Sequence, residues 1–343
     1  MPSELSPILE QLLLGQDIGE AGAARTLVAL TQPDCPPALA GALLAALRSK
    51  GETADEIRGM AGAMRSLARC PELPVIEGLT DVVGTGGDGS GSLNLSTGTA
   101  LLAAACGVPI IKHGNRSISS KSGSADVLEA LGMPLPLDEH QAANYLQRCG
   151  FSFLFAPYYH PAMKSVAPVR SSMGVRTVFN ILGPLTNPAA PPYHLIGAFS
   201  AEMAELMAQS LSGTDLTRAF VVHGDPGWDE ATPVGPFLLF DVTPGQVTRT
   251  VRDPAEWGLP RCSPEDLAGG DATGNAARIR AVFQGEEHGP HRDALVLGAA
   301  LVLELTGRSP GPPEAAETVA ATLDEGAAAR LLGELPGDGR NEV

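Results

Sequence analysis

The sequence predicts an α/β protein with a mainly parallel central sheet flanked by helices, preceded by a small all-helical N-terminal domain. Two observations predict this fold. From Leu79 onward short apolar runs alternate with helical segments, whereas residues 1–70 show helical periodicity throughout. Alternating strands and helices are typical of a parallel sheet that is covered on both faces. With 343 residues, the chain is long enough for both domains and a sizeable core.

Four short helices are expected in residues 1–70. Ser6 is a predicted cap with Pro7 at the first helical position, and an apolar stripe follows before Gly15. Helices this short are not stable alone, so their apolar faces must pack against one another, the main domain or a second subunit. The other three are expected over residues 20–30, after Pro36-Pro37, and after the capping box Thr53-x-x-Glu56.

Six apolar runs after residue 79 are expected to be strands. Ligands of parallel sheets bind at the carboxyl ends of the strands. The site is therefore expected where the first two runs end, at Gly84 and Lys112. The runs cover residues 81–83, 108–111, 153–155, 193–197, 219–222 and 237–241.

A glycine loop follows the first strand. Gly84, Gly86, Gly87, Gly89 and Gly91 occupy five of eight positions, so the loop exposes backbone N–H groups instead of side chains. Glycine reaches positive φ without steric cost, and such a loop can surround phosphate oxygens with donors. The polar residues of 94–97 then precede an apolar helix, and the next strand runs into a basic turn that starts at Lys112. This order predicts a polyanionic ligand.

Two other readings of this loop fail on context. Gly84, Gly86 and Gly89 match the dinucleotide fingerprint, but no helix opens on the third glycine and the second strand ends in Lys112 instead of an acidic residue. A calcium loop that starts at Asp88 would place Leu93 at a position that requires glycine.

Several segments resemble one known family. The family is the anthranilate phosphoribosyltransferases, and the similarity extends more weakly over nearly the whole chain. The resemblance implies a fold like that of nucleoside phosphorylases and phosphoribosyltransferases, with a helical domain of residues 1–75 joined by helices from about 161–190. Residues 76–160 and 191–343 would then form the α/β domain. The matching segments are Gly84-Thr85-Gly86-Gly87-Asp88, Asn94-Leu95-Ser96-Thr97, and residues 112–116, 119–126, 160–164 and 176–188.

The resemblance implies transfer of phosphoribose from 5-phosphoribosyl 1-diphosphate (PRPP) to the amine of anthranilate, with release of diphosphate, in tryptophan biosynthesis. A helix cap or a turn is the alternative role for Ser92 and Ser124, and Ser92 replaces the more usual threonine. The residues to which the resemblance assigns PRPP binding are Gly84, Gly87, Asp88, Ser92, Asn94, Leu95, Ser96, Thr97, Lys112, Ser120 and Ser124.

The resemblance also implies Mg²⁺, with Ser96, Asp229 and Glu230 as ligands. Magnesium prefers oxygen ligands and commonly uses one or two carboxylates together with substrate phosphates. In a chain with 39 acidic residues such a pair by itself indicates a solvated loop, and the match to the family's Asp-Glu pair favours the metal. Trp228 stands where the family usually has leucine.

For anthranilate, the resemblance points to Gly84, Asn115 and Arg170. A guanidinium suits a planar carboxylate because it donates two parallel hydrogen bonds. His113 and Arg176 are further candidates for the acceptor pocket, with a packed histidine and a structural arginine as the alternatives. His160-Pro161 and residues 180–188 are expected to shape the hinge between the domains.

Two rival functions remain open on the sequence. A pyrimidine nucleoside phosphorylase has a related architecture and a similar basic turn, but the pair Asp229-Glu230 and the segment 160–188 favour the transferase. A non-catalytic ligand-binding relative would not be expected to keep both the loop and the metal ligands. The pair His288 and His291 is interpreted as a solvated turn, because no further ligand is nearby.

Composition restricts partners and compartment. A formal net charge of −16 argues against nucleic acid as a partner. Residues 112–176 nevertheless contain seven Lys or Arg against four Asp or Glu, as an anionic substrate requires. Five widely spaced cysteines without a CxxC pair argue for a reducing compartment, so a cytoplasmic enzyme is expected. No signal peptide and no run of 18 apolar residues direct the chain to a membrane. The resemblance further implies a homodimer that forms through the helical domain.

Overall fold

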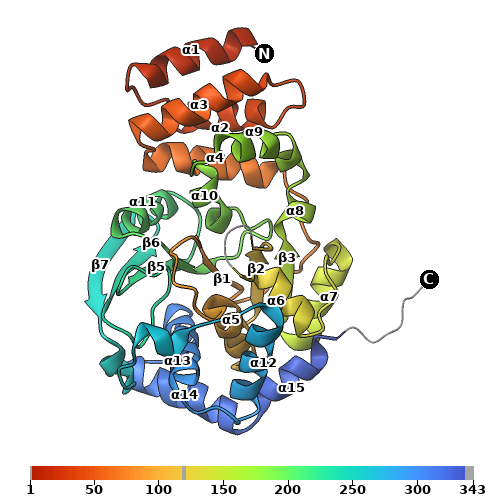
Figure 1. Cartoon of the computed structure of the whole chain (residues 1–343), viewed down its shortest axis with the longest axis vertical. Helices are drawn as coiled ribbons and strands as arrows, with labels where there is room; N and C mark the ends of the chain where they lie inside the picture. Colours follow the sequence, from red (N-terminus) through yellow and green to blue (C-terminus); the bar gives the residue numbers. More distant parts are fainter. Residues whose placement is uncertain (1, 118–120, 337–343) are drawn as a thin grey trace, which may run out of the picture.

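A computed structural model describes residues 2–117 and 121–336 of the chain (Figure 1). The N-terminal helices form a lobe at one end, and the sheet with its covering helices forms the larger part. None of the helices in these described ranges combines the length and apolar character that crossing a membrane requires. The N-terminal helices are α1 Pro2–Leu13, α2 Gly19–Leu30, α3 Pro37–Lys50 and α4 Ala54–Ser66.

The helical lobe follows the predicted pattern apart from its first turn. The capping box is present, since the Thr53 hydroxyl accepts from Glu56 N–H and the Glu56 carboxylate accepts from Thr53 N–H. The expected cap at Ser6 is wrong, because α1 begins at Pro2 and contains Pro7. A proline this close to the start of a helix removes one N–H donor, and the apolar stripe of α1 continues through it.

One sheet of seven strands has the order β3-β2-β1-β4-β5-β6-β7. The first five strands in this order are parallel, and β6 and β7 are antiparallel additions. This confirms the predicted mainly parallel α/β fold. The strands are β1 Thr80–Gly84, β2 Ile110–Gly114, β3 Phe151–Phe155, β4 Tyr193–Gly197, β5 Arg218–Gly224, β6 Phe237–Thr243 and β7 Gln246–Arg252.

The strand order reverses between β1 and β4. From β1 the chain moves outward through β2 to β3 and then returns to the other side of β1 as β4, which places Gly84 beside Gly197 in the parallel register. A reversal of this kind leaves a crevice at the carboxyl ends of the two strands, and ligands of open α/β sheets bind there.

The two faces of the sheet contribute to two hydrophobic cores. Val82 packs with the core that contains α5 and α13, whereas Val83 packs with the core that contains α11 and the helical lobe. Successive side chains of a strand point to opposite faces, so one short strand serves both cores. The remaining α-helices are α5 Leu95–Ala105, α6 Ser124–Ala130, α7 Glu139–Cys149, α8 Ala156–Tyr159, α9 Ala167–Met173, α10 Phe179–Leu182, α11 Ala201–Ser212, α12 Ala272–Phe283, α13 Pro290–Leu305, α14 Pro312–Asp324 and α15 Ala327–Glu334.

Short helices and turns connect the two parts of the molecule. Helix α9 packs on α3 and α10 packs on α4, so part of the segment between β3 and β4 lies against the N-terminal helices (Figure 1). The 3-10 helices are η1 Pro161–Lys164, η2 Gly183–Leu185, η3 Pro254–Trp257 and η4 Pro264–Leu267.

Three expectations about local structure are corrected. Lys112 and His113 lie inside β2 and not in a turn after it, because β2 is shifted toward the carboxyl end. The helix after the glycine loop begins at Leu95, so Ser96 and Thr97 belong to its first turn. His291 is buried in α13 and its Nδ1 lies 2.8 Å from Glu287 Oε1, so only the exposed His288 fits the predicted solvated turn.

Candidate active site

The glycine loop lies directly after β1, at the carboxyl edge of the sheet. Gly86, Gly87, Gly89 and Gly91 all have φ between 63° and 74°, the left-handed region that favours glycine. Asp88 closes the loop on itself, because its Oδ1 accepts from Ser90 N–H at 3.1 Å and from the Ser90 hydroxyl at 3.0 Å. The loop thus has the backbone conformation that a concave set of N–H donors requires.

The loop after β5 folds back to place Asp229 against the glycine loop. Asp229 Oδ2 accepts from Gly86 N–H at 2.6 Å, and Asp229 N–H donates to Asp88 Oδ2 at 3.3 Å. A Cβ atom at Gly197 would lie 1.5 Å from the main-chain oxygen of Asp229, and a Cβ at Gly84 would lie 2.5 Å from Asp229 Oδ2. Glycine at the ends of β1 and β4 therefore allows this acidic loop to reach the crevice.

Glu230 lies at the N-terminus of α5. Its Oε1 accepts from Ser96 N–H at 3.0 Å, so this carboxylate satisfies one of the helix's unpaired donors. The Asn94 side chain makes no capping bond to the helix that it precedes. The predicted metal ligands Ser96, Asp229 and Glu230, which are far apart in sequence, are therefore brought together around the glycine loop.

Both carboxyl groups have a raised pKa. Burial, reinforced by the nearby Asp88, raises the pKa of Asp229 to about 7. Burial together with the Asp229 charge raises the pKa of Glu230 to about 8, although Lys112 acts in the opposite direction. A divalent cation between these groups would remove the repulsion that disfavours their ionised forms.

The donor set fits magnesium that is completed by a substrate. Neither Asp229 nor Glu230 forms an ion pair with any residue in the described ranges, and within these ranges no three His, Cys, Asp or Glu side chains could hold a metal by themselves. Two carboxylates and a serine hydroxyl fill only part of the octahedral coordination shell of Mg²⁺ and leave coordination positions for phosphate oxygens. Mg²⁺ is usually bound in this way in phosphate-binding sites.

Lys112 lies buried within strand β2, next to the site, and not in an exposed turn. It is 2 % exposed, and its Nζ donates to the main-chain oxygen of Val82. Burial lowers the pKa of Lys112, while Asp81, Glu230 and Asp229 act in the opposite direction. Lys112 thus supplies a positive charge close to the acidic pair, although its ammonium group contacts the backbone.

A polar network surrounds Asn94. Its Oδ1 accepts from the Ser122 hydroxyl at 2.8 Å and from Asn275 Nδ2 at 2.7 Å. The sequence interpretation did not find Asn275, because no local motif distinguishes it and its partner lies 181 positions away. It also did not find Asn187, whose Nδ2 donates to Asp81 Oδ2 and to the Ile111 carbonyl, both at 2.8 Å, and so ties the segment before β4 to the sheet.

The other predicted donor-site residues are less closely connected. The Ser124 hydroxyl donates to the Asn115 carbonyl at 3.2 Å, and the Ser92 hydroxyl lies 3.1 Å from that of Ser90. The Thr97 hydroxyl is buried and bonds no other described residue. Ser120 lies outside the described residues.

Within the described part of the chain, no hydrogen bond or ion pair joins the predicted acceptor residues to one another. Arg170 lies on α9 with its guanidinium 4.9 Å from the centre of the Phe179 ring, and burial lowers its pKa. Asn115 is exposed at the end of β2. His113 is a packed histidine, because it is 3 % exposed and its Nδ1 faces the Gly183 carbonyl at 3.2 Å. Burial and the nearby His160 lower its pKa to about 3.

Arg176 connects the glycine loop to the helical lobe. Its Nη2 donates to the Gly87 carbonyl, and its guanidinium lies 4.2 Å from the centre of the Phe199 ring. Its own main-chain oxygen accepts from Arg48 of α3. The structure therefore places Arg176 at the glycine loop.

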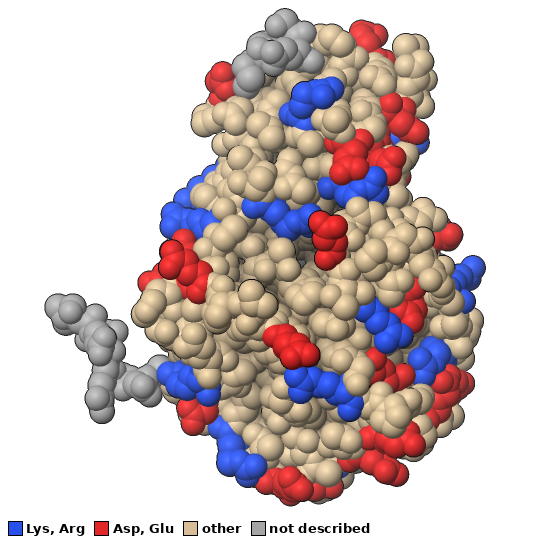
Figure 2. Space-filling model, turned by 180° about the vertical axis from the view of Figure 1, so that it is seen from behind, with Lys and Arg blue, Asp and Glu red and all other residues tan. Residues whose placement is uncertain are grey.

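The surface is hollowed where the two parts of the molecule meet. Figure 2 shows this hollow at the waist, with both basic and acidic side chains at its rim. Junctions between domains are common places for small-molecule sites.

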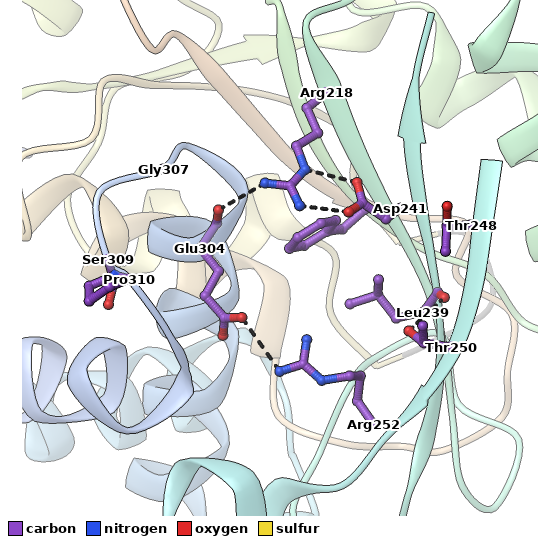
Figure 3. Close-up of a pocket in the computed structure, with 11 residues that line it drawn as sticks. Arg218, Leu239, Asp241, Thr248, Thr250, Arg252, Glu304, Gly307, Ser309 and Pro310 are labelled. Atoms are coloured by element: carbon purple, nitrogen blue, oxygen red, sulfur yellow. Dashed lines mark hydrogen bonds and ion pairs between the residues drawn. The ribbon is translucent and has the colours of Figure 1, made fainter. Parts of the chain in front are cut away.

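A separate pocket of about 360 Å³ lies at the opposite edge of the sheet, where β5 begins with Arg218 (Figure 3). Its charges are mutually paired. Arg218 donates from Nε and Nη2 to Asp241 at 2.8 and 2.6 Å, and Arg252 lies 3.5 Å from Glu304. Because substrates of parallel sheets bind at the carboxyl ends of strands, this pocket is not the predicted site.

Comparison with known proteins gives the class first. Residues 6–68 match the family model described as "Glycosyl transferase family, helical bundle domain", and residues 77–329 match "Glycosyl transferase family, a/b domain". The chain is therefore a glycosyl transferase built from these two domains.

Similar proteins identify the particular family. An anthranilate phosphoribosyltransferase from Rubrobacter xylanophilus is 43% identical over 328 residues, which cover 96% of this chain and 95% of the relative. The crystal structure of the Thermus thermophilus enzyme has a TM-score of 0.89 at 42% identity and covers 96% of this chain and 98% of that one. The structure of the Saccharomyces cerevisiae enzyme in complex with PRPP and Mg also has a TM-score of 0.89, at 25% identity. The match covers 98% of this chain and 97% of that one. The chain belongs to the anthranilate phosphoribosyltransferase family and is a pentosyltransferase of tryptophan biosynthesis.

Proposed function

We propose that the crevice between β1 and β4 binds PRPP and that the phosphoribosyl group is transferred there to the amine of anthranilate. The meeting of Asp229 and Glu230 with the glycine loop and the α5 N-terminus supports this proposal most strongly. The residues proposed to bind PRPP are Gly84, Gly87, Asp88, Ser92, Asn94, Leu95, Ser96, Thr97, Lys112, Ser120 and Ser124.

Mg²⁺ is proposed to bind at Ser96, Asp229 and Glu230 together with substrate oxygens. When bound, the ion neutralises charge on the departing diphosphate. A structure of the Saccharomyces cerevisiae relative is in complex with PRPP and Mg, and a structure of a variant of it has Mg bound. The raised pKa values of Asp229 and Glu230 support the assignment, because neighbouring carboxyl groups that are shielded from water favour a bound cation.

The backbone of this chain stabilises the leaving group. Cleavage of the bond between C1 and the diphosphate oxygen places negative charge on the diphosphate, and preorganised N–H groups and cations stabilise such charge. The N–H groups of Gly87, Asp88 and Gly89 bond no acceptor among the described residues and are suited to this role. Because an aromatic amine is mostly unprotonated at neutral pH, the reaction does not require a strong general base.

Anthranilate is proposed to bind at Gly84, Asn115 and Arg170. Arg170 is half-buried and makes no ion pair with a described residue, so its guanidinium remains available for a carboxylate. A structure of the Saccharomyces cerevisiae relative contains 4-fluoroanthranilate.

The enzyme is further proposed to be a cytoplasmic homodimer. Leu13, Leu14 and Val28 are exposed on the helical lobe, and a second subunit would cover such apolar side chains. The five cysteines are all free, which supports a reducing compartment. The proposed division is a helical domain of residues 1–75 with helices from about 161–190, and an α/β domain of residues 76–160 and 191–343.

Asp229→Asn tests the central assignment. The magnesium concentration for half-maximal activity and the KM for PRPP should each rise at least about tenfold, since a charge-assisted contact of roughly 1.5 kcal/mol is lost. Anthranilate binding should change little. Calorimetric binding of PRPP with and without Mg²⁺ provides a second measurement, and Glu317→Gln on the exposed face of α14 is the matched control. An unchanged magnesium dependence would show that Asp229 is not a ligand.

A further inference from the structure

Asn275 is a buried polar residue that touches the PRPP site from a distant part of the chain. It lies on α12 and is 3 % exposed. Its Nδ2 lies 2.7 Å from Asn94 Oδ1 and 3.0 Å from the Ser122 hydroxyl. Its Oδ1 lies 2.6 Å from the backbone nitrogen of Gly270.

The backbone of Gly270 determines which way the Asn275 amide faces. A backbone N–H can only donate, so the atom of Asn275 that faces it must be the oxygen. The NH₂ group of Asn275 therefore faces Asn94. An NH₂ group has no acceptor capacity, so the atom of Asn94 that faces it must in turn be an oxygen.

Asn94 is consequently held in one orientation. Its Oδ1 accepts from Asn275 and from the Ser122 hydroxyl, which uses both lone pairs of the oxygen. Its Nδ2 donates one hydrogen to the Ser122 carbonyl at 3.2 Å. The second hydrogen of Nδ2 bonds no acceptor among the described residues, and Asn94 is partly exposed beside the first turn of α5.

The segment before Asn275 is also fastened to the substrate loop. Leu93 N–H donates to the Leu267 carbonyl at 3.0 Å, and Gly269 N–H donates to the Gly91 carbonyl at 2.8 Å. A Cβ atom at Gly269 would lie 2.4 Å from the Ser92 carbonyl oxygen, so the two backbones are in close contact. Residues 267–275 therefore reach the loop at two places, through the backbone at 91–93 and through Asn275 at Asn94.

We propose that Asn275 is a positioning residue that holds the Asn94 amide with its N–H side toward PRPP. Asn94 then acts as a hydrogen-bond donor to an oxygen of the phosphoribosyl or diphosphate group. This inference rests on the proposed role of Asn94 in PRPP binding.

Asn275→Asp tests the proposal with almost no change of shape. The carboxylate keeps the bond from Gly270 N–H but turns a second oxygen toward Asn94 Oδ1, so the Asn94 amide should turn over and present its oxygen to the anionic substrate. The KM for PRPP should rise at least about tenfold, and the KM for anthranilate should stay within about twofold. Asn144→Asp, at an exposed position of α7, is the matched control.

The pH dependence separates positioning from simple loss of structure. In Asn275→Asp, the protonated carboxyl group still has an O–H donor for Asn94, whereas the carboxylate has none. Burial and the facing Asn94 oxygen should raise the pKa of a carboxyl group at position 275, so the ratio of the variant's KM for PRPP to that of the wild type should increase as the pH rises through that pKa. An equal rise in the KM values for PRPP and anthranilate, or a ratio that falls as the pH rises, would overturn the inference.

Asn94→Ala distinguishes the inference from the proposed function. If this variant binds PRPP as well as the wild type does, the assignment of Asn94 to the PRPP site is wrong. If it weakens PRPP binding and Asn275→Asp adds no further loss in the double variant, Asn275 acts through Asn94 as proposed. Fully additive losses would show that Asn275 acts independently of Asn94.

Discussion

Gly84→Ala introduces one methyl group next to the proposed metal site. The new Cβ would lie 2.5 Å from Oδ2 and 3.2 Å from Cγ of Asp229, closer than non-bonded atoms tolerate. Because the backbone of Gly84 lies in a strand, alanine causes no strain of its own there. The Asp229 carboxylate must therefore move, and it loses the 2.6 Å bond from Gly86 N–H.

The size of the effect follows from that bond. A hydrogen bond to a charged group contributes about 1.5–3 kcal/mol, so kcat/KM for PRPP should fall about 10- to 150-fold. The loss of kcat/KM for PRPP should appear at every magnesium concentration below saturation. The loss is measured from initial rates of anthranilate consumption, which are monitored through anthranilate fluorescence at varied concentrations of PRPP and Mg²⁺.

Two further glycine variants serve as controls. Gly62 lies inside α4, and a Cβ atom there would have no neighbouring atom within 4 Å, so Gly62→Ala should retain activity and stabilise the fold by about 0.5–1 kcal/mol. Gly197→Ala should lower both activity and melting temperature, because its Cβ would meet the Asp229 backbone at 1.5 Å. Wild-type kcat/KM for PRPP in Gly84→Ala would refute the role assigned to the Asp229 carboxylate.

Two more predictions concern the acceptor and the buried histidines. Arg170→Ala should raise the KM for anthranilate at least about tenfold and that for PRPP much less, whereas Arg249→Ala on the exposed strand β7 should change neither; equal effects on both substrates would contradict the assignment. Burial lowers the pKa of His194 to about 4, so between pH 6.5 and 4 the unfolded chain binds a proton that the folded protein excludes, and stability falls as pH falls. The raised pKa values of Asp229 and Glu230 have the opposite effect on stability. Because both groups are also present in His194→Gln, the difference in urea unfolding between the wild type and this variant isolates the effect of His194. The wild type should lose about 2 kcal/mol relative to the variant between about pH 6.5 and about pH 5, and a constant difference would show that His194 protonates equally in both states.

Local patterns were sufficient for most of the fold. The capping box at Thr53, the glycine loop and the apolar runs of the inner strands are each contained in a few consecutive residues. Strand β7 was missed because its residues are mostly exposed and it lacks an apolar run, although Pro244-Gly245 between it and β6 is a turn signal. The shift of β2 was missed because Lys112, a charged residue, is buried in it.

The sequence by itself determined the family, the α/β class and the set of residues that could bind a polyanion and a metal, because those properties are carried by short segments of defined composition. Only the tertiary structure decided which distant residues meet. It brought Asp229 against Gly86, Glu230 against the α5 N-terminus and Asn275 against Asn94. Such contacts depend on the order of strands in the sheet and on close backbone approach at Gly84 and Gly197, and no local pattern records either.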